Sequence, residues 1–405
     1  MSGTDPAAEA AEAADFGLLT PATAGTAAEA LTGDAAVLTA LVRAEAALLR
    51  AQVSVGLLPA AGAVVADRVE AARATLDPRA LALAAPAGGN PVIPLVAALR
   101  EAVAGERPEE AGWIHRGATS QDVLDTALVL VTESVLERVE HDLQRLAGLL
   151  AGLVQAHRDT PMVARTLTQQ ALPSTLGLRL AGWLAGVHDA LETVRSCRPL
   201  PASLSGPVGS ASAFAAQGPA VLSAYAGELG LAVPVLGWHT RRHPVLAVGA
   251  ALGEAGGACG KIAADVLVMA QTEVGEARES VGGTSSSMSH KANPVLSVLV
   301  SSAARQLAPL GSVLVASAAA EQERPAGAWH AEWQPLRGML RLAGAAAEHT
   351  AGLVGGVAFD EAALRRNLDR LVEALGKDEP WVAGHTQAAG PWVDRVLAQH
   401  REVVG

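Results

Sequence analysis

A long stretch without proline most constrains the fold of this chain. No proline occurs between Asp122 and Thr160. Apolar residues recur there at three- and four-residue steps and mark one helical face. This face is formed by Val135, Leu136, Val139, Leu143, Leu146, Leu149, Leu150 and Leu153. A helix of this length would be about 50–60 Å long, at a rise of 1.5 Å per residue. The stretch therefore predicts one long helix whose apolar side packs against other helices.

Two further apolar segments without proline, 174–198 and 245–293, indicate that this helix belongs to a bundle. Of all residues 50% are hydrophobic, mainly Ala, Leu and Val, and only 3% are aromatic, which favours helices over a β-sandwich or barrel. We therefore predict an all-α chain. The domain boundaries are predicted from turn-forming residues at 105–108 and from repeated Gly and Pro near the C-terminus. The domains are a small N-terminal helical domain (1–112), a central long-helix bundle (113–351) and a short C-terminal helical domain (352–405).

The composition also excludes several classes of protein. Cys197 and Cys259 are the only cysteines, which excludes a disulfide framework and fits a reducing cytoplasm. We expect no metal, because no histidine or acid pair stands at ligand spacing on a helix. A net charge of −11 with only three lysines argues against nucleic acid as a partner. Prolines break the uncharged stretch 199–227, and the acidic start is no signal peptide, so we expect a cytoplasmic protein without a membrane partner.

The segment 282–294 carries the strongest chemical signal. It reads Gly-Gly-Thr-Ser-Ser-Ser-Met-Ser-His-Lys-Ala-Asn-Pro, and its Gly/Ser run does not hold a helix, so we expect a mobile loop between helices. The hydroxyl groups, the backbone N–H groups and the Lys291 cation suit an anionic substrate. A flexible Ser/Gly linker is the alternative, although a linker has no need of the Lys-x-Asn-Pro ending.

The segment 113–122 stands immediately before the longest predicted helix. Thr119, Ser120 or Asp122 can cap that helix, and the N–H groups at its start favour a bound carboxylate. His115 adds a side chain that titrates near neutral pH. A plain helix cap without further function is the alternative.

Three other segments are weaker candidates. Segment 164–173 carries Gln169 ahead of an apolar helix, and a surface loop explains it about as well. Segment 238–244 is basic within an acidic chain. Segment 323–333 carries Arg324 and two tryptophans, and a packing patch between helices is the alternative there.

Three of these segments resemble, in the same order, the motifs of the fumarase/aspartase superfamily. Segment 282–294 resembles its signature G-S-S-x-M-P-x-K-x-N-P. Segment 113–122 is similar to its first motif, H-x-G-x-T-S-Q-D, and segment 164–173 to its second. The resemblance covers roughly residues 16–370 and implies an all-α enzyme with a long central bundle.

Within the superfamily, the chain is most similar to the bacterial 3-carboxy-cis,cis-muconate cycloisomerases. Leu167 stands where fumarases and the argininosuccinate and adenylosuccinate lyases carry a histidine, and Val298 stands where they carry its glutamate partner. The resemblance implies interconversion of 3-carboxy-cis,cis-muconate and 4-carboxymuconolactone in the β-ketoadipate pathway of aromatic-compound catabolism. No cofactor is implied, since the substrate supplies every atom. It also implies a homotetramer whose active sites are shared between subunits.

The resemblance also implies roles for individual residues. Ser285 corresponds to the catalytic serine, the general base of the elimination direction. The residues implied to bind the small polycarboxylate substrate are His115, Thr119, Ser120, Gln169, Lys291, Asn293 and, more weakly, Arg324. No residue is implied as the general acid.

Three residues depart from the signature and keep other reactions open. Thr284 replaces its last Gly, Ser289 its Pro, and Ala292 the Arg expected between Lys and Asn. A tricarboxylate substrate would benefit from that missing cation. The alternative is a superfamily lyase that eliminates fumarate or a related alkene from an adenylo-, nitro- or argininosuccinate. A non-catalytic scaffold is the third hypothesis, and the presence of Ser285, Lys291 and Asn293 argues against it.

Overall fold

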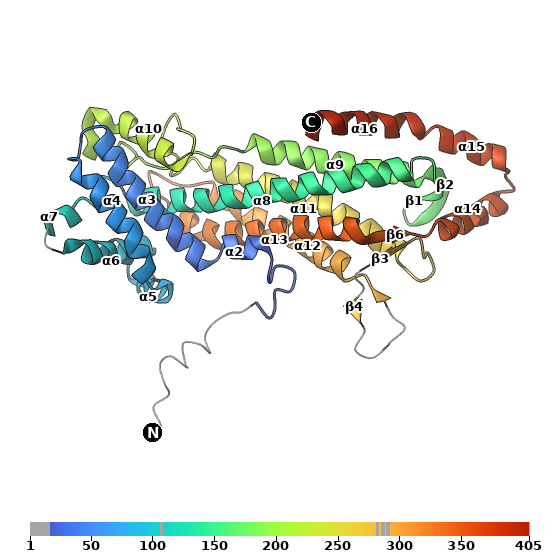
Figure 1. Cartoon of the computed structure of the whole chain (residues 1–405), viewed down its shortest axis with the longest axis horizontal. Coiled ribbons are helices and arrows are strands. Elements are labelled where there is room, and N and C mark those ends of the chain that lie inside the picture. Colours follow the sequence, from blue (N-terminus) through green and yellow to red (C-terminus); the bar gives the residue numbers. More distant parts are fainter. Residues whose placement is uncertain (1–16, 106–107, 281–282, 285–287, 289–291, 405) are drawn as a thin grey trace, which may run out of the picture.

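Helices dominate the structure, a computed structural model that describes residues 17–105, 108–280, 283–284, 288 and 292–404. They form one elongated bundle, which confirms the all-α prediction (Figure 1). The α-helices are α2 (Ala27–Leu31), α3 (Asp34–Ser54), α4 (Ala61–Ala72), α5 (Pro78–Ala84), α6 (Val92–Ala104), α7 (Pro108–Ala111), α8 (Ser120–Ala156), α9 (Leu176–Ser196), α10 (Gly218–Leu229), α11 (His243–Met269), α12 (Val295–Ser317), α13 (Ala328–Gly356), α14 (Glu361–Leu375), α15 (Glu379–Gln387) and α16 (Gly390–Val404). The 3₁₀ turns are η1 (Arg73–Thr75), η2 (Ala85–Ala87) and η3 (Ser212–Gln217).

The predicted long helix is α8, which forms the axis of the bundle. It has 37 residues and is therefore about 55 Å long. Most of its predicted apolar face is buried: Val135, Leu136, Val139, Leu143, Leu146 and Leu150. α8 packs against α9 and α13, while α11 and α12 complete the bundle on α13. The sequence pattern thus places both this helix and its buried side correctly.

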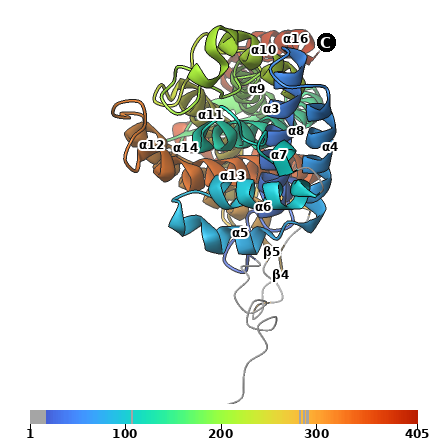
Figure 2. The same ribbon diagram turned by 90° about the vertical axis from the view of Figure 1, so that its left-hand side faces the viewer.

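The two ends of the bundle carry different sets of short helices (Figures 1 and 2). α3, α4, α5 and α6 gather at the end where α8 begins. Asp77 accepts a hydrogen bond from the Arg79 N–H at 2.9 Å and so caps α5. Pro78 is the first residue of this helix, a position that suits proline. At the other end, α14 and α15 lead into α16, which runs back along α9.

Six short strands form three two-stranded antiparallel sheets among the described residues. They are β1 (Pro161–Thr166) with β2 (Gln169–Thr175), β3 (Ala277–Glu279) with β6 (Val357–Phe359), and β4 (Gly283–Thr284) with β5 (Ala292–Asn293). The segment 164–173 is therefore part of a hairpin beyond the end of α8, a structure that was not predicted from the sequence. Leu167 and Thr168 both have positive φ, at 49° and 67°, which gives the tight turn that joins β1 to β2.

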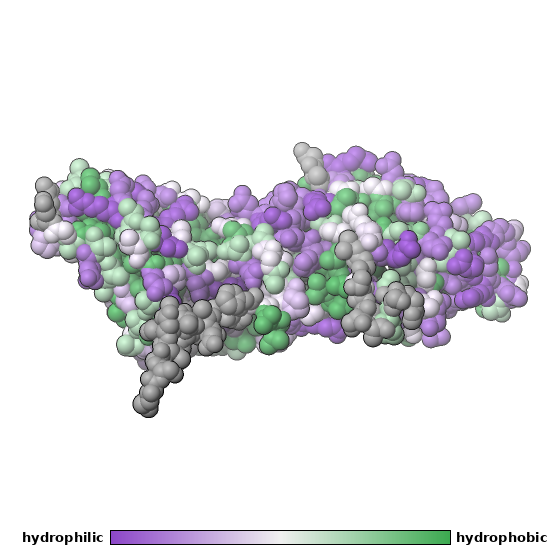
Figure 3. Space-filling view, turned by 60° about the horizontal axis from the view of Figure 1, so that its bottom comes forward, coloured by the Kyte–Doolittle hydropathy of each residue, from purple (hydrophilic) through white to green (hydrophobic). Residues whose placement is uncertain are grey.

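Two described helices, α11 and α12, are long and apolar enough to cross a membrane by length and composition. In α12 only 22% of the most apolar window is buried, and Val298 and Val315 are exposed by 51% and 67%. The face of the molecule that Figure 3 shows carries apolar patches along its middle, whereas the end formed by the last helices is hydrophilic. The described residues of this chain therefore leave apolar side chains of α12 uncovered.

Candidate active site

The start of α8 is held by a buried carboxylate. Thr119 is the residue before the helix, and its N–H donates to Asp122 Oδ2 at 2.9 Å. The N–H groups of Ser205 and Gly206 donate to the same carboxylate at 2.8 and 3.0 Å, and His239 Nε2 lies 2.7 Å from Asp122 Oδ1. Asp122 is fully buried. It therefore fixes the glycine-rich loop that follows Leu204 against the start of the helix.

His115 lies beside this loop and is oriented by an acid from another helix. Its Nδ1 is 2.6 Å from Oε1 of Glu45, which is fully buried in α3. His115 has φ of 64°, a conformation that non-glycine residues adopt rarely and that often marks a functional site. Burial lowers the pKa of His115, but the hydrogen bond and charge of Glu45 outweigh it, so this pKa is raised above its usual value. The pair thus favours a protonated, positively charged imidazole.

Arg324 reaches the same place from the loop between α12 and α13. Its Nη2 donates to Thr119 Oγ1 at 2.9 Å and to the Pro207 carbonyl at 3.3 Å. Three segments that are far apart in the sequence thus meet at one point, next to Ser120, the first residue of α8. Arg324 and, in its protonated form, His115 are thus cationic groups that suit a substrate carboxylate.

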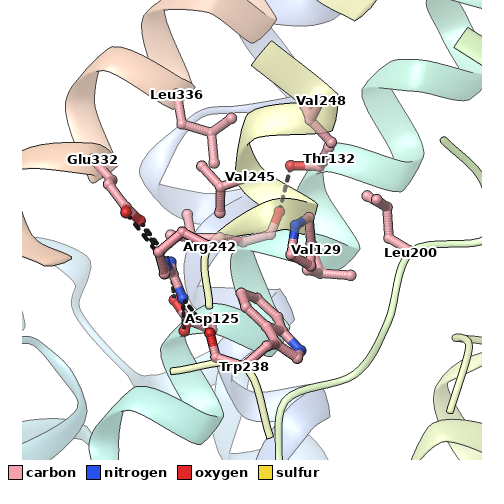
Figure 4. Close-up of a pocket in the computed structure, with 12 residues that line it drawn as sticks. Asp125, Val129, Thr132, Leu200, Trp238, Arg242, Val245, Val248, Glu332 and Leu336 are labelled. Atoms are coloured by element: carbon pink, nitrogen blue, oxygen red, sulfur yellow. Dashed lines mark hydrogen bonds and ion pairs between the residues drawn. The ribbon is translucent and has the colours of Figure 1, made fainter. Parts of the chain in front are cut away.

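Segments 238–244 and 323–333 meet beneath this site in a buried ion network (Figure 4). Arg242 lies 2.7 Å from Asp125 and 2.6 Å from Glu332, and all three side chains are almost fully buried. Burial lowers the pKa of Arg242, but the two carboxylates raise it by more, so the guanidinium stays charged. The Trp329 indole N–H donates to Asp125 at 3.0 Å, and Arg242 lies over the Trp238 ring at 4.8 Å. Most of the side chains named here thus join helices in the core, whereas His239 contacts Asp122 and Arg324 contacts Thr119 at the start of α8.

The hairpin β1–β2 lies at the opposite end of α8. Gln169 is exposed there, next to the turn, and its Nε2 donates to Thr168 Oγ1 at 3.4 Å. Arg165, lower in β1, makes two hydrogen bonds of 2.6 and 2.8 Å to the buried carboxylate of Glu276. Glu276 precedes β3, so the hairpin is tied to the strand that leads into the segment 282–294.

The signature segment itself is only partly described. Ser285 and Lys291 lie outside the described residues. Asn293 is half-buried in β5 and pairs with Gly283, while Thr284 pairs with Ala292. The sequence predicted a plain loop here, but its two ends pair as short strands.

The described residues of the three motifs do not come together within a single chain. His115, Thr119, Ser120 and Arg324 gather where α8 begins, whereas Gln169 and the strands β4 and β5 lie toward its other end (Figure 1). The length of α8 separates the first motif from the second by about 55 Å. The described residues of the three motifs therefore lie in two groups, one toward each end of the bundle.

Comparison with known proteins supplies the family. A family model described as Lyase matches residues 18–308. The chain belongs to this lyase family. It is a member of the fumarase/aspartase superfamily, as the three motifs predicted, and it is an enzyme of that superfamily.

The relatives of this lyase carry out more than one reaction. It is 46% identical over 374 residues to nitrosuccinate lyase of Streptomyces davaonensis, which covers 89% of this chain and 78% of that protein. It is 42% identical over 330 residues to 3-carboxy-cis,cis-muconate cycloisomerase of Pseudomonas aeruginosa, covering 80% and 72% of the two chains. The solved structure of the 3-carboxy-cis,cis-muconate lactonizing enzyme from Pseudomonas putida matches with a TM-score of 0.86 at 32% identity, over 96% of this chain and 100% of that one.

Sequence reasoning missed two parts of the site in this lyase. Glu45 lies 70 residues before His115, inside a helix that shows only an apolar pattern, so no signal links the two. The loop at Ser205 and Gly206 lies in the stretch 199–227, whose prolines argued against a membrane span, and no other role was predicted for it from the sequence. Its glycines are the signal that could have pointed to it, because glycine adopts the positive φ that this loop uses. No group of three or more His, Cys, Asp or Glu that could hold a metal ion occurs in the part of the chain that the structure describes.

Proposed function

We propose that this lyase-family enzyme interconverts 3-carboxy-cis,cis-muconate and 4-carboxymuconolactone. The observation that carries the proposal is the match to the Pseudomonas putida lactonizing enzyme, because it extends over 96% of this chain and the whole of that one. Cycloisomerases of this name from four organisms, at 36–42% identity, add support. The reaction belongs to aromatic-compound catabolism through the β-ketoadipate pathway, in the cytoplasm.

The chemistry requires one proton transfer and one C–O bond change. In the direction that opens the lactone, Ser285 removes a proton from the carbon next to a carboxylate, and the ring oxygen leaves as the second carboxylate. The intermediate places two negative charges on the first carboxylate, so positioned donors lower the barrier most. Lys291 and Asn293 hold this group, while Thr119, Ser120 and Gln169 bind the remainder of the substrate. No cofactor is required for these steps.

His115 supplies positive charge to this scheme. Burial lowers the pKa of His115, but the hydrogen bond and charge of Glu45 raise it by more, which favours the protonated ring. A protonated imidazole next to Arg324 binds a substrate carboxylate and stabilises the charge that develops on it. The group that leaves is itself a carboxylate, which is a weak base and needs no proton. This explains why a histidine is dispensable at the position of Leu167.

A complete active site requires more than one copy of the chain. The half-site with His115 and the half-site with Asn293 lie at opposite ends of one bundle, so we propose a homotetramer in which each site combines both. The exposed apolar residues of α12, among them Val298 and Val315, support a contact with another copy in the bundle. The proposed partners are thus other copies of this chain and a small polycarboxylate substrate, not nucleic acid or a membrane.

Elimination of nitrite from nitrosuccinate is the second candidate. The 46% identity to nitrosuccinate lyase over 89% of the chain favours it. Ala292 favours it as well, because nitrosuccinate has two carboxylates and needs one cation fewer than a tricarboxylate. The mechanism is the same up to the leaving group: Ser285 removes the proton, the C–N bond breaks, and nitrite and fumarate are released.

One pair of assays decides between the two candidates. In the first assay the purified protein is mixed with 3-carboxy-cis,cis-muconate, and the loss of the substrate's ultraviolet absorbance is measured. In the second it is mixed with nitrosuccinate, and the release of nitrite is measured. We expect kcat/KM for the muconate to exceed that for nitrosuccinate by about tenfold or more. Nitrosuccinate has one carboxylate fewer, and the loss of one contact to a charged group lowers kcat/KM by at least that factor. The reverse order would favour nitrosuccinate, and no turnover of either substrate would refute both. Ser285→Ala controls for contaminating activity in each assay.

A further inference from the structure

Glu279 connects the two sides of the signature segment 282–294. It is the last residue of β3, and its buried carboxylate reaches the first turn of α12 on the far side of that segment. Oε2 accepts the Leu296 N–H at 3.1 Å, and Oε1 accepts the Ser297 N–H at 2.9 Å and the Ser297 hydroxyl at 2.5 Å. One carboxylate thus takes three hydrogen bonds across the base of the segment.

No residue next to α12 performs this role. The residue before the helix is Pro294, which makes no capping hydrogen bond with its side chain, and the first turn of α12 has no acidic residue. The N–H groups at a helix start need acceptors, and a negative charge there is favourable. Because Glu279 and Ser297 are both buried, water does not replace this contact at little cost.

The start of α12 in turn determines where β4 and β5 lie. Gly283 approaches Val295 so closely that a Cβ on it would lie 2.1 Å from Val295 Cγ2. Gly283 also pairs with Asn293, which is two residues before Val295. On the other side, Glu279 is fixed because it pairs with Val357 in β6, and the Ser280 N–H donates to the Gly356 carbonyl at 3.0 Å. A shift of the helix start would therefore move β4 and β5 together.

We infer that Glu279 is a positioning residue of the active site: its carboxylate fixes the start of α12 and thereby places Asn293 for substrate. Glu279 does not touch the substrate in this arrangement and acts through Asn293. The inference rests on the proposed function only in that Asn293 binds substrate. Small displacements of a binding group reduce catalysis strongly, so an effect on turnover is expected even where the fold is retained.

The test uses Glu279→Gln, which keeps the size of the side chain but turns an amide NH₂ toward N–H groups. The matched control is Asp378→Asn, because Asp378 caps α15, outside the signature segment, at the Trp381 N–H, at 3.1 Å. We expect Glu279→Gln to lower kcat/KM by about tenfold to a hundredfold, while Asp378→Asn leaves it near wild type. Glu279→Gln should lower Tm more than Asp378→Asn, because the Glu279 carboxylate is buried and takes three hydrogen bonds, whereas Asp378 is exposed and caps α15 with one. If Glu279→Gln does not fold, Ser297→Ala removes one of the three hydrogen bonds and should give a smaller loss of the same kind.

A double variant separates positioning from general stability. If Glu279 acts through Asn293, Glu279→Gln should lower kcat/KM by a much smaller factor in the Asn293→Ala variant than in the wild-type protein. Equal costs in both backgrounds, or wild-type kcat/KM in Glu279→Gln, would overturn the inference while the proposed function stands. Wild-type activity in Asn293→Ala would overturn the role of Asn293 and the inference with it.

Amide hydrogen exchange tests the same contact without any substrate. In Glu279→Gln, exchange should accelerate in residues 283–284 and 292–297 and stay unchanged in α8. Unchanged exchange in those residues would overturn the inference even if both assays of the proposed function fail. Faster exchange together with no turnover of either substrate would instead refute the proposed reactions and leave the structural contact intact.

Discussion

The two ends of the bundle are built in different ways. Where α8 begins, buried polar contacts lie within the chain: Asp122 receives three backbone N–H groups, and Arg242 joins Asp125 and Glu332 in the core. At the other end, Gln169 stands exposed at the tip of a hairpin, and Asn293 lies in a strand of two residues. The end where α8 begins is therefore preorganised by contacts within the chain, whereas Gln169 at the other end is exposed, and we expect that surface to meet another copy.

The sharpest way to break this comparison is to remove the buried cation at the preorganised end. Arg242→Met leaves Asp125 and Glu332 buried without their partner, which should lower the free energy of unfolding by about 3–5 kcal/mol. Denaturant unfolding measures this. Arg365→Met is the control at the other end, because Arg365 pairs with Glu379 at 2.8 Å on the surface. Arg365→Met should lower the free energy of unfolding by about 0–1 kcal/mol. Equal losses in the two variants would contradict the difference between the ends.

The signature segment should show the opposite behaviour, with a large effect on activity and a small one on stability. Ser285→Ala should reduce kcat by about two orders of magnitude or more, as expected when a positioned base is lost. KM should change little, because other groups bind the substrate. Steady-state kinetics and Tm measure the two effects. Ser286→Ala is the matched control and should have a much smaller effect; near-wild-type turnover in Ser285→Ala would leave the segment without its assigned role.

The pair of Glu45 and His115 predicts a pH dependence with a definite sign. The pKa of His115 is raised because Glu45 outweighs burial, so its charge is retained at low pH and lost as pH rises through that pKa. Catalysis that uses the charged ring should therefore fall on the alkaline side, and Glu45→Gln should move this fall to lower pH. The stability that the pair contributes is likewise present below the usual histidine pKa, near 6.5, and lost as pH rises. A profile of kcat/KM against pH that is the same in wild type and Glu45→Gln would be incompatible with this role.

The smallest expected effect concerns the turn of the β1–β2 hairpin. Leu167 and Thr168 both adopt positive φ, which suits Asn and Gly better than a bulky or β-branched side chain. Leu167→Asn combined with Thr168→Gly should raise stability by a few tenths to about 1 kcal/mol, measured by thermal unfolding. Leu167→Val should lower it. A destabilised Asn-Gly variant would show that contacts of these side chains outweigh the backbone strain.

The sequence predicted regular, repetitive features well and irregular ones poorly. The periodic apolar face of α8 predicted both the helix and its buried residues, because helical spacing is a property of neighbouring positions. The strands β4 and β5 were not predicted, since each has two residues and forms only by pairing with the other. The hairpin was missed for a related reason: its turn uses Leu and Thr where a sequence pattern looks for Gly or Asn.

The site was predicted as a set of residues but not as an arrangement. Thr119 at the start of α8 follows from local capping preferences. Glu45, in contrast, reaches His115 from 70 residues away, and the cap of α12 by Glu279 spans 17 and 18 residues. Such contacts are determined by how helices pack, which a single sequence does not display.

Subunit complementation tests most directly the claim that one active site combines half-sites from different copies. His115→Ala disables the half-site at the start of α8, and Ser285→Ala disables the half-site in the signature segment. Each variant alone should be nearly inactive. When the two are mixed under conditions that let subunits exchange, some sites receive an intact half from each variant, and turnover well above that of either component should appear. A mixture that stays as inactive as its components, while light scattering and mass spectrometry show mixed oligomers, would contradict the shared site.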